Sequence, residues 1–104
     1  MSKRKAAATR WTDRALGDLE AIGDFIARDN PRAALRWVEK LMATARKAAP
    51  LPLRGRRVPE VGRDDVREVF PKTYRTVYRV VPDGIEVLTV FEGHRLFPAA
   101  PNEE

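Results

Sequence analysis

Cysteine is missing from the 104-residue sequence, and histidine occurs once, at His94. Without cysteine the chain can form neither a disulfide nor a thiolate metal site, so its stability must come from packing or from a bound partner. A single histidine has no second imidazole with which to build a zinc site. We therefore expect this protein to hold no metal ion and no cofactor.

Several further signatures are missing. The sequence has neither a glycine-rich phosphate loop nor a GxSxG nucleophile elbow, which argues against nucleotide binding, serine hydrolysis and a small-molecule substrate. No apolar run approaches the roughly 18 residues of a membrane-spanning helix. The basic start Met1–Lys5 is followed by only four small residues before Arg10, which is too short for the apolar core of a signal peptide. We expect a cytoplasmic protein without a membrane partner.

The length leaves room for one domain with a modest core, because a chain of this size buries only about two-thirds of its surface on folding. The composition along the chain predicts a basic flexible tail over residues 1–7, a single domain over residues 8–98 and a C-terminal tail over residues 99–104.

Positive charge is in excess but unevenly distributed. Twenty lysines and arginines against fifteen acidic residues give a net charge of +5. Residues 1–50 hold eleven basic and six acidic side chains, whereas residues 51–104 hold nine of each. The excess can attract a polyanion or an acidic protein. An ordinary solvated surface with a basic tail explains the same numbers equally well.

Two amphipathic helices are predicted in the first half. Residues 8–11 form a candidate short strand, and Thr12 then suits the N-cap of a helix that ends near Arg28. Its expected apolar stripe is Leu16, Leu19, Ile22 and Ile26, with Asp13, Asp18 and Asp24 on a solvated face.

The pair Asn30-Pro31 suits the start of a second helix, which Pro50 and Pro52 stop. The short connection predicts an antiparallel helical hairpin. The expected stripe of the second helix is Ala34, Leu35, Val38, Leu41, Met42, Ala45 and Ala49.

The pattern changes to strands after a proline- and glycine-rich loop at residues 50–65. Runs rich in β-branched and aromatic residues predict strands at 66–70, 74–81 and 85–92, and the breaks at 71–73 and 82–84 make two hairpins of them. The fold class that follows is α+β, with the helical hairpin packed on one face of a small, curved, mainly antiparallel sheet. Because the strand at 74–81 alternates Arg75 and Arg79 with valines, we expect the other face to be partly open.

These elements and motifs resemble the RelE/ParE superfamily of bacterial toxins from type II toxin–antitoxin modules. The resemblance extends from Arg10 to Pro98 and depends on six segments in order: Trp11–Ile26, Asn30–Ala33, Gly55–Glu60, Val66–Glu68, Tyr74–Arg79 and Val90–Leu96. It implies two N-terminal helices on a curved antiparallel sheet and a cognate antitoxin that wraps the toxin. RelE-like members cut mRNA on the ribosome, whereas ParE-like members inhibit DNA gyrase.

The resemblance assigns conditional roles to several residues. In a RelE-like nuclease, Arg75 and Arg95 match arginines that stabilise the scissile phosphate, and His94 is a candidate for proton transfer. The nuclease lysines, however, fall on Val66 and Glu68, and no tyrosine follows Phe97.

The ParE-like branch is therefore favoured, with plasmid stabilisation and growth inhibition as its expected role. Arg67, Arg79 and Tyr78 are candidates for contact with the target or antitoxin. The alternatives are a RelE-like enzyme acting on ribosome and mRNA, and a non-toxic module that only binds antitoxin. For each candidate an ordinary structural role, such as a turn contact for His94, also fits the sequence.

Overall fold

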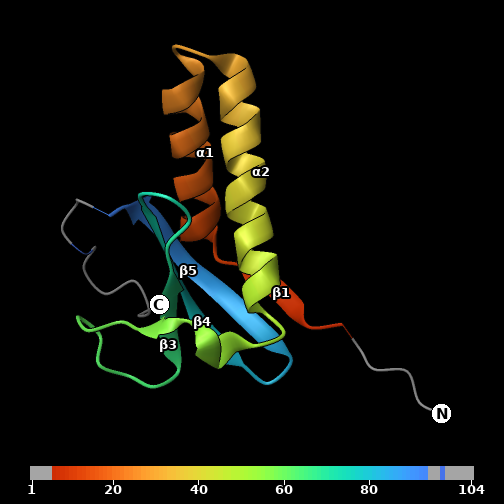
Figure 1. Ribbon diagram of the computed structural model, residues 1–104, viewed down its shortest axis with the longest axis vertical. Coiled ribbons are helices and arrows are strands. Elements are labelled where there is room, and N and C mark those ends of the chain that lie inside the picture. The colour runs from red at the N-terminus through yellow and green to blue at the C-terminus, as the bar shows by residue number, and fades with distance from the viewer. Residues whose placement is uncertain (1–5, 94–96, 98–104) are drawn as a thin grey trace.

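The computed structural model of the protein describes residues 6–93 and residue 97. Two helices, α1 (Asp13–Ala27) and α2 (Pro31–Ala48), stand side by side as a hairpin (Figure 1). Both predicted N-caps are confirmed. The Thr12 hydroxyl accepts a hydrogen bond from the backbone N–H of Ala15, and the Asn30 side-chain oxygen accepts one from Ala33, so each cap satisfies a donor that the first turn leaves unpaired.

The rest of the chain forms one five-stranded sheet. Its strands are β1 (Ala8–Trp11), β2 (Arg56–Arg57), β3 (Val66–Val69), β4 (Tyr74–Val81) and β5 (Gly84–Glu92), in the order β1-β5-β4-β3-β2. The pair β1–β5 is parallel and the other three pairs are antiparallel. A short 3-10 helix, η1 (Pro52–Arg54), precedes β2. The α+β architecture predicted from the sequence is confirmed.

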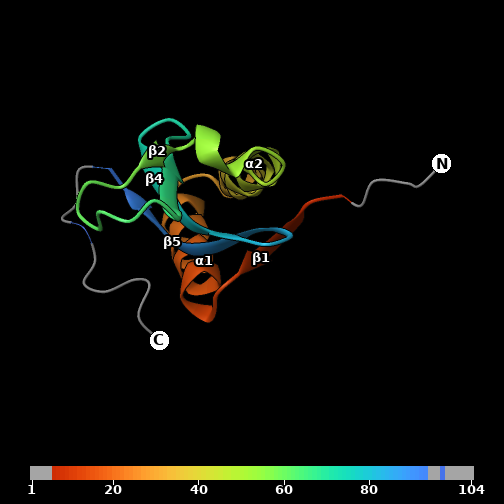
Figure 2. The ribbon, with the colours of Figure 1, turned by 90° about the horizontal axis from the view of Figure 1, so that it is seen from below.

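The sheet has a buried cluster on each face. On the helix side, Tyr78, Ile85 and Val87 pack with Leu19 of α1 and Leu41 of α2. A β-bulge between β4 and β5 shifts the alternation along β5. The loop that joins β2 to β3 lies on the side of the sheet away from the helices (Figure 2), which we call the far face. This face has its own buried cluster, made of Val58, Val66, Val77, Leu88 and Phe91. The far face is therefore covered where the sequence suggested an opening.

Three predictions about the helices were wrong. Leu16 and Leu35 do not belong to the buried stripe and are 49% and 74% exposed. The hairpin projects past the sheet (Figure 1), so Leu35, which lies near the start of α2 at the far end of the hairpin, has no sheet to pack against. Asp18 does not lie on a solvated face, because its carboxylate accepts hydrogen bonds from the Thr89 hydroxyl and from the backbone N–H of Val90 in β5.

Neither helix of the described residues is long and apolar enough to cross a membrane. The tail boundaries at residues 7 and 98 stay a prediction.

Candidate functional site

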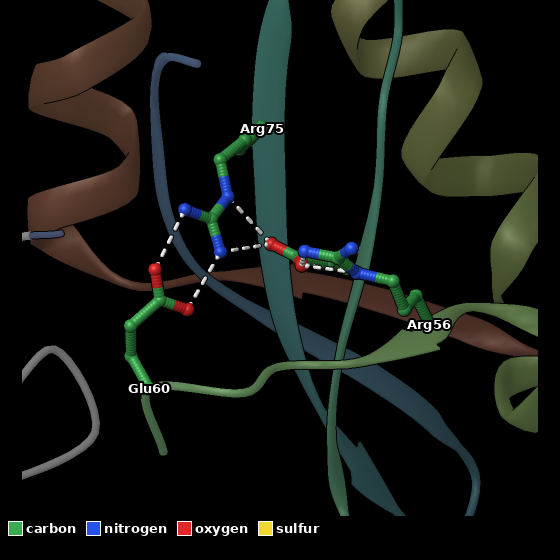
Figure 3. Close-up of polar contacts among 4 residues, drawn as sticks. Arg56, Glu60 and Arg75 are labelled. Atoms are coloured by element: carbon green, nitrogen blue, oxygen red, sulfur yellow. Dashed lines mark hydrogen bonds and ion pairs between the residues drawn. The ribbon is translucent and has the colours of Figure 1, made fainter. Parts of the chain in front are cut away.

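The candidate site is built around Arg75, which β4 directs onto the far face (Figure 3). Both terminal guanidinium nitrogens donate to the two carboxylate oxygens of Glu60, at 3.0 Å each. The Nε of Arg75 donates to Glu68 in β3 at 2.7 Å. The side chain is only 9% exposed. Arg75 therefore spans a loop carboxylate and a strand carboxylate.

Glu68 is fully buried and lies between two arginines. One carboxylate oxygen accepts from Arg75, and the other accepts from Nε of Arg56 in β2 at 2.9 Å. Arg56, Glu60, Glu68 and Arg75, which we call the charge network, thus contain two positive and two negative groups. A buried carboxylate is tolerated when hydrogen bonds and opposite charges replace the lost water, and the network meets that condition.

The network perturbs its own protonation equilibria. The hydrogen bond from Arg75 lowers the pKa of Glu60, and burial only partly opposes that effect. Conversely, the hydrogen bond to Glu60 raises the pKa of Arg75, with Glu68 contributing in the same direction. Both shifts favour the charged forms, so the pair stays ionised at neutral pH.

Aromatic rings enclose the same guanidinium. Its carbon lies 5.3 Å from the ring centroid of Phe91 and 5.2 Å from that of Phe97. Arg56 lies 5.1 Å from the centroid of Phe70, at the end of β3. Cation–π contact and carboxylate contact together occupy the faces and the hydrogen-bonding edge of the Arg75 guanidinium. In this arrangement Arg75 does not present a free cation to a substrate phosphate.

The other predicted residues lie away from this network. Arg67 donates to the backbone carbonyls of Leu53, Gly55 and Asp64, so it fastens the loop that contains η1 and β2. Arg79 donates to Glu86 across the β4–β5 pair at 2.7 Å, and its side chain is 39% exposed. Of these two arginines, Arg79 keeps the clearer surface for a partner.

Tyr78, by contrast, is fully buried in the helix-side core, and its hydroxyl donates to the backbone carbonyl of Pro52. Burial also raises the pKa of this phenol. A β-carbon added at Gly55 would lie 2.2 Å from the hydroxyl oxygen, so glycine is needed there. The prediction that Tyr78 contacts a partner is corrected, because a side chain without accessible surface cannot do so unless the core opens. His94 and Arg95 lie outside the described residues.

Sequence reasoning missed Glu60 and Glu68 as partners of Arg75, and Arg56 as the second partner of Glu68. Glu68 follows Val66 by two residues and precedes Phe70 by two, so the alternation of a strand places its side chain on the same face as these two apolar residues. An acidic residue at a core-facing position is a signal for a buried ion pair. Within residues 6–93 and 97 no cluster of three or more acidic or histidine side chains could hold a metal ion.

A second feature is a groove of about 550 Å³ between α1 and the end of the β4–β5 pair. Phe25 forms its outer wall and is 66% exposed, with the guanidinium of Arg28 over its ring at 5.9 Å. Tyr74 lines the sheet side, where its ring packs edge-on against Trp37 of α2. An apolar floor with a charged rim is typical of surfaces that bind an amphipathic segment.

Comparison with known proteins agrees with this architecture. Residues 9–97 match the model of a family described as the ParE toxin of the type II toxin–antitoxin system parDE. A curated protein of Sinorhizobium fredii, named as a candidate toxin Y4kP, is 34% identical over 94 residues, which cover 86% of this chain and 91% of that protein.

Two further similarities are more limited. Toxin RelE2 of Caulobacter vibrioides is 48% identical over 46 residues, covering 44% of this chain and 52% of that protein. A solved chain of the chromosomal ParDE toxin–antitoxin system from P. aeruginosa superimposes with a TM-score of 0.66 at 22% identity, over 84% of this chain and 96% of that one. At that identity the structural likeness speaks for the fold alone.

Proposed function

Because this chain belongs to the ParE toxin family of type II toxin–antitoxin systems, we propose that it poisons DNA gyrase until a cognate antitoxin neutralises it. The chain is the toxin component of such a module, and its antitoxin is its partner. The step to gyrase is the proposal.

The contacts of Arg75 with two carboxylates are the observation that favours gyrase over the ribosome as the target. A ribosome-dependent nuclease needs cations that face the scissile phosphate and stabilise the charge that develops there. The Arg75 guanidinium already binds Glu60 and Glu68, and Val66 and Glu68 stand where that branch has lysines. An arginine neutralised by two carboxylates offers little net attraction to a phosphate. This favours a toxin that acts by binding.

The proposal is tested by adding purified protein to two reactions, gyrase supercoiling of relaxed plasmid and translation in a coupled extract whose message is mapped for cuts. We expect loss of supercoiling and an intact message. The antitoxin, added first, should restore supercoiling. Normal supercoiling together with codon-phased cuts would refute the gyrase assignment.

One observation favours a nuclease as a second candidate. The 46-residue match to toxin RelE2 is the higher of the two identities, and Arg75, Arg95 and His94 match nuclease positions by motif. In this version Glu60 must leave Arg75 before a phosphate can bind. If cutting is seen, the variants H94A and R95A should reduce it, and cutting that survives both changes would exclude these roles.

A non-toxic antitoxin-binding module is the third candidate. It predicts tight antitoxin binding by a folded protein that leaves growth unchanged when expressed alone. For all three candidates we propose the groove beside Phe25 as the main antitoxin contact, with Arg79 as a charged contact on the sheet. Arg67 is a weaker candidate, because its donors already bind backbone carbonyls.

A further inference from the structure

The two helices of the hairpin carry opposite charge. Within α2 there are five basic side chains and one acidic one, which gives 5 − 1 = +4. Within α1 there are four acidic side chains and one basic one, which gives 1 − 4 = −3. The modest net charge of the whole chain therefore hides a strongly basic helix that projects beyond the sheet (Figure 1).

Four of the cations of α2 lie on one face. At 100° per residue, Arg32, Lys40 and Lys47 fall within about 40° of Arg36 around the helix axis. Their positions span about 22 Å along that axis. All four are exposed, and we call them the basic stripe: Arg32, Arg36, Lys40 and Lys47. None of them forms an ion pair with any other residue in the described part of the chain.

Helix stability does not explain the basic stripe. Cations are favourable in the last turn of a helix, which accounts for Lys47. The first turn of a helix is where a positive charge is unfavourable, yet Arg32 lies there and no acidic residue accompanies it. Like charges spaced by four residues also repel, and Arg32, Arg36 and Lys40 form two such pairs. The arrangement weakens the isolated helix, so the stability of α2 does not account for it.

We propose that the basic stripe binds the phosphate backbone of duplex DNA. The inference rests on the proposed function, because gyrase acts on DNA and a toxin bound to gyrase would lie beside that duplex. A line of cations without ion-pair partners among the described residues, spaced one to two helical turns apart, suits a polymer with repeated negative charges. Such contacts position a protein on DNA and read no sequence.

A protein partner fits this face less well. Energetically dominant protein contacts use aromatic or apolar anchors in a desolvated centre. Between the cations the stripe contains only the small Ala43, whereas Trp37 turns toward Tyr74 of the sheet. The exposed Phe25, which is such an anchor, belongs to the groove on α1. The basic stripe and the groove beside Phe25 therefore suit different partners.

The test measures binding of the full-length protein to a fluorescent duplex of random sequence at several salt concentrations, without gyrase. Each neutralised phosphate contributes about −0.9 to the slope of log K against log salt, so four contacts weaken binding roughly 150-fold between 50 and 200 mM salt. The variant R36Q/K40Q should flatten the slope by about 1.8. The control R14Q/K72Q removes two exposed cations elsewhere and should leave the slope unchanged.

Three outcomes would overturn the inference. The first is a salt-dependence slope for R36Q/K40Q that equals the slope for the wild type. The second is a control, R14Q/K72Q, whose slope flattens as much as that of R36Q/K40Q. The third is a protein that binds poly-L-glutamate through the stripe but does not bind DNA. The last outcome would identify an acidic protein as the occupant. Circular dichroism shows whether each variant is folded. In R36Q/K40Q both exposed side chains of α2 are replaced by glutamine, another good helix former.

A parallel supercoiling assay separates this inference from the proposed function. If the stripe binds DNA but the wild-type protein leaves gyrase active, the DNA surface stands and the gyrase proposal fails. If the wild type inhibits gyrase while R36Q/K40Q inhibits it equally and retains full DNA binding, the gyrase proposal stands and the stripe does not contribute. We expect R36Q/K40Q to need at least tenfold more protein for the same inhibition.

Discussion

Glu68 has no exposed surface and holds two guanidinium groups, Arg56 and Arg75, on the far face. Removing one member of a buried ion pair leaves the other charge uncompensated, which typically costs about 3–5 kcal/mol. We expect the substitution Glu68→Ala to lower the free energy of unfolding in urea by an amount in that range. Asp64→Ala is the control, because its carboxylate is 85% exposed beside Arg57 and should contribute no more than about 0.5 kcal/mol. A loss below 1 kcal/mol in Glu68→Ala would contradict a structural role for the network.

The Glu60–Arg75 pair should make the free energy of unfolding depend on pH in the acid range. Arg75 lowers the pKa of Glu60 below its ordinary value of 4.5, so the unfolded chain takes up this proton at a higher pH than the folded chain does. The contribution of Glu60 is therefore complete above the unfolded pKa and is lost as the pH falls through the folded one. In urea titrations from pH 7 downward, we expect Glu60→Gln to be less stable than wild type at pH 7 and to lose less stability on acidification. Parallel curves for the two proteins would show that the pair contributes nothing.

Asp18 decides how α1 is fixed to the sheet. Its carboxylate accepts from the Thr89 hydroxyl and from the backbone N–H of Val90, two donors that are cut off from water. Hydrogen bonds to a charged group contribute about 1.5–3 kcal/mol each, and an unsatisfied buried donor adds to the loss. We expect Asp18→Ala to destabilise the protein by at least 2 kcal/mol in thermal or urea unfolding. The exposed Asp24 of the same helix gives the control, Asp24→Ala, for which a change within about 0.5 kcal/mol is expected. Equal effects of the two changes would assign Asp18 to the surface after all.

The elements that sequence predicts well here are those with local causes. The caps Thr12 and Asn30 bind donors three residues away, and the strands β3 to β5 have their own breaks, so neighbouring residues suffice to place them. The sequence failed where the partner is distant. Asp18 meets Val90, 72 residues away, and Leu35 is exposed because the sheet ends before the helix does. The two-residue strand β2 is too short to show any periodicity, and its ladder with β3 creates the burial of Glu68.

In the candidate site, too, the sequence predicted features that have a local cause and missed those that depend on a distant residue. Arg75 could be identified from its motif and from its position in an apolar strand. Its partner Glu60 could not, because Glu60 lies in a loop that is held in place by the packing of Val58 in the far-face cluster. Tyr78 was a candidate for contact with a partner and is instead buried, because the sequence of β4 alone does not say which face of the strand the helices cover. Arg67 was expected to contact a partner, but it donates to three backbone carbonyls. No sequence pattern predicts hydrogen bonds from a side chain to backbone carbonyls of a loop.

At the scale of the whole molecule, the hairpin exposes an apolar groove on α1 and a basic stripe on α2, and the two surfaces can be tested separately. The groove beside Phe25 offers an aromatic anchor to an amphipathic antitoxin segment. Truncating such an anchor typically costs 2 kcal/mol or more, which is about 30-fold in Kd. We therefore expect Phe25→Ser to weaken binding of the purified cognate antitoxin by at least that factor in calorimetry.

Leu53→Ser is the matched control, because Leu53 is 62% exposed on η1 and lies outside that groove. Its antitoxin affinity should equal that of the wild type, and so should that of R36Q/K40Q, because the basic stripe is assigned to DNA. If Leu53→Ser weakens binding and Phe25→Ser does not, the antitoxin binds over the η1 loop. If R36Q/K40Q alone weakens it, α2 is the antitoxin surface, and the division of the hairpin between two partners is wrong.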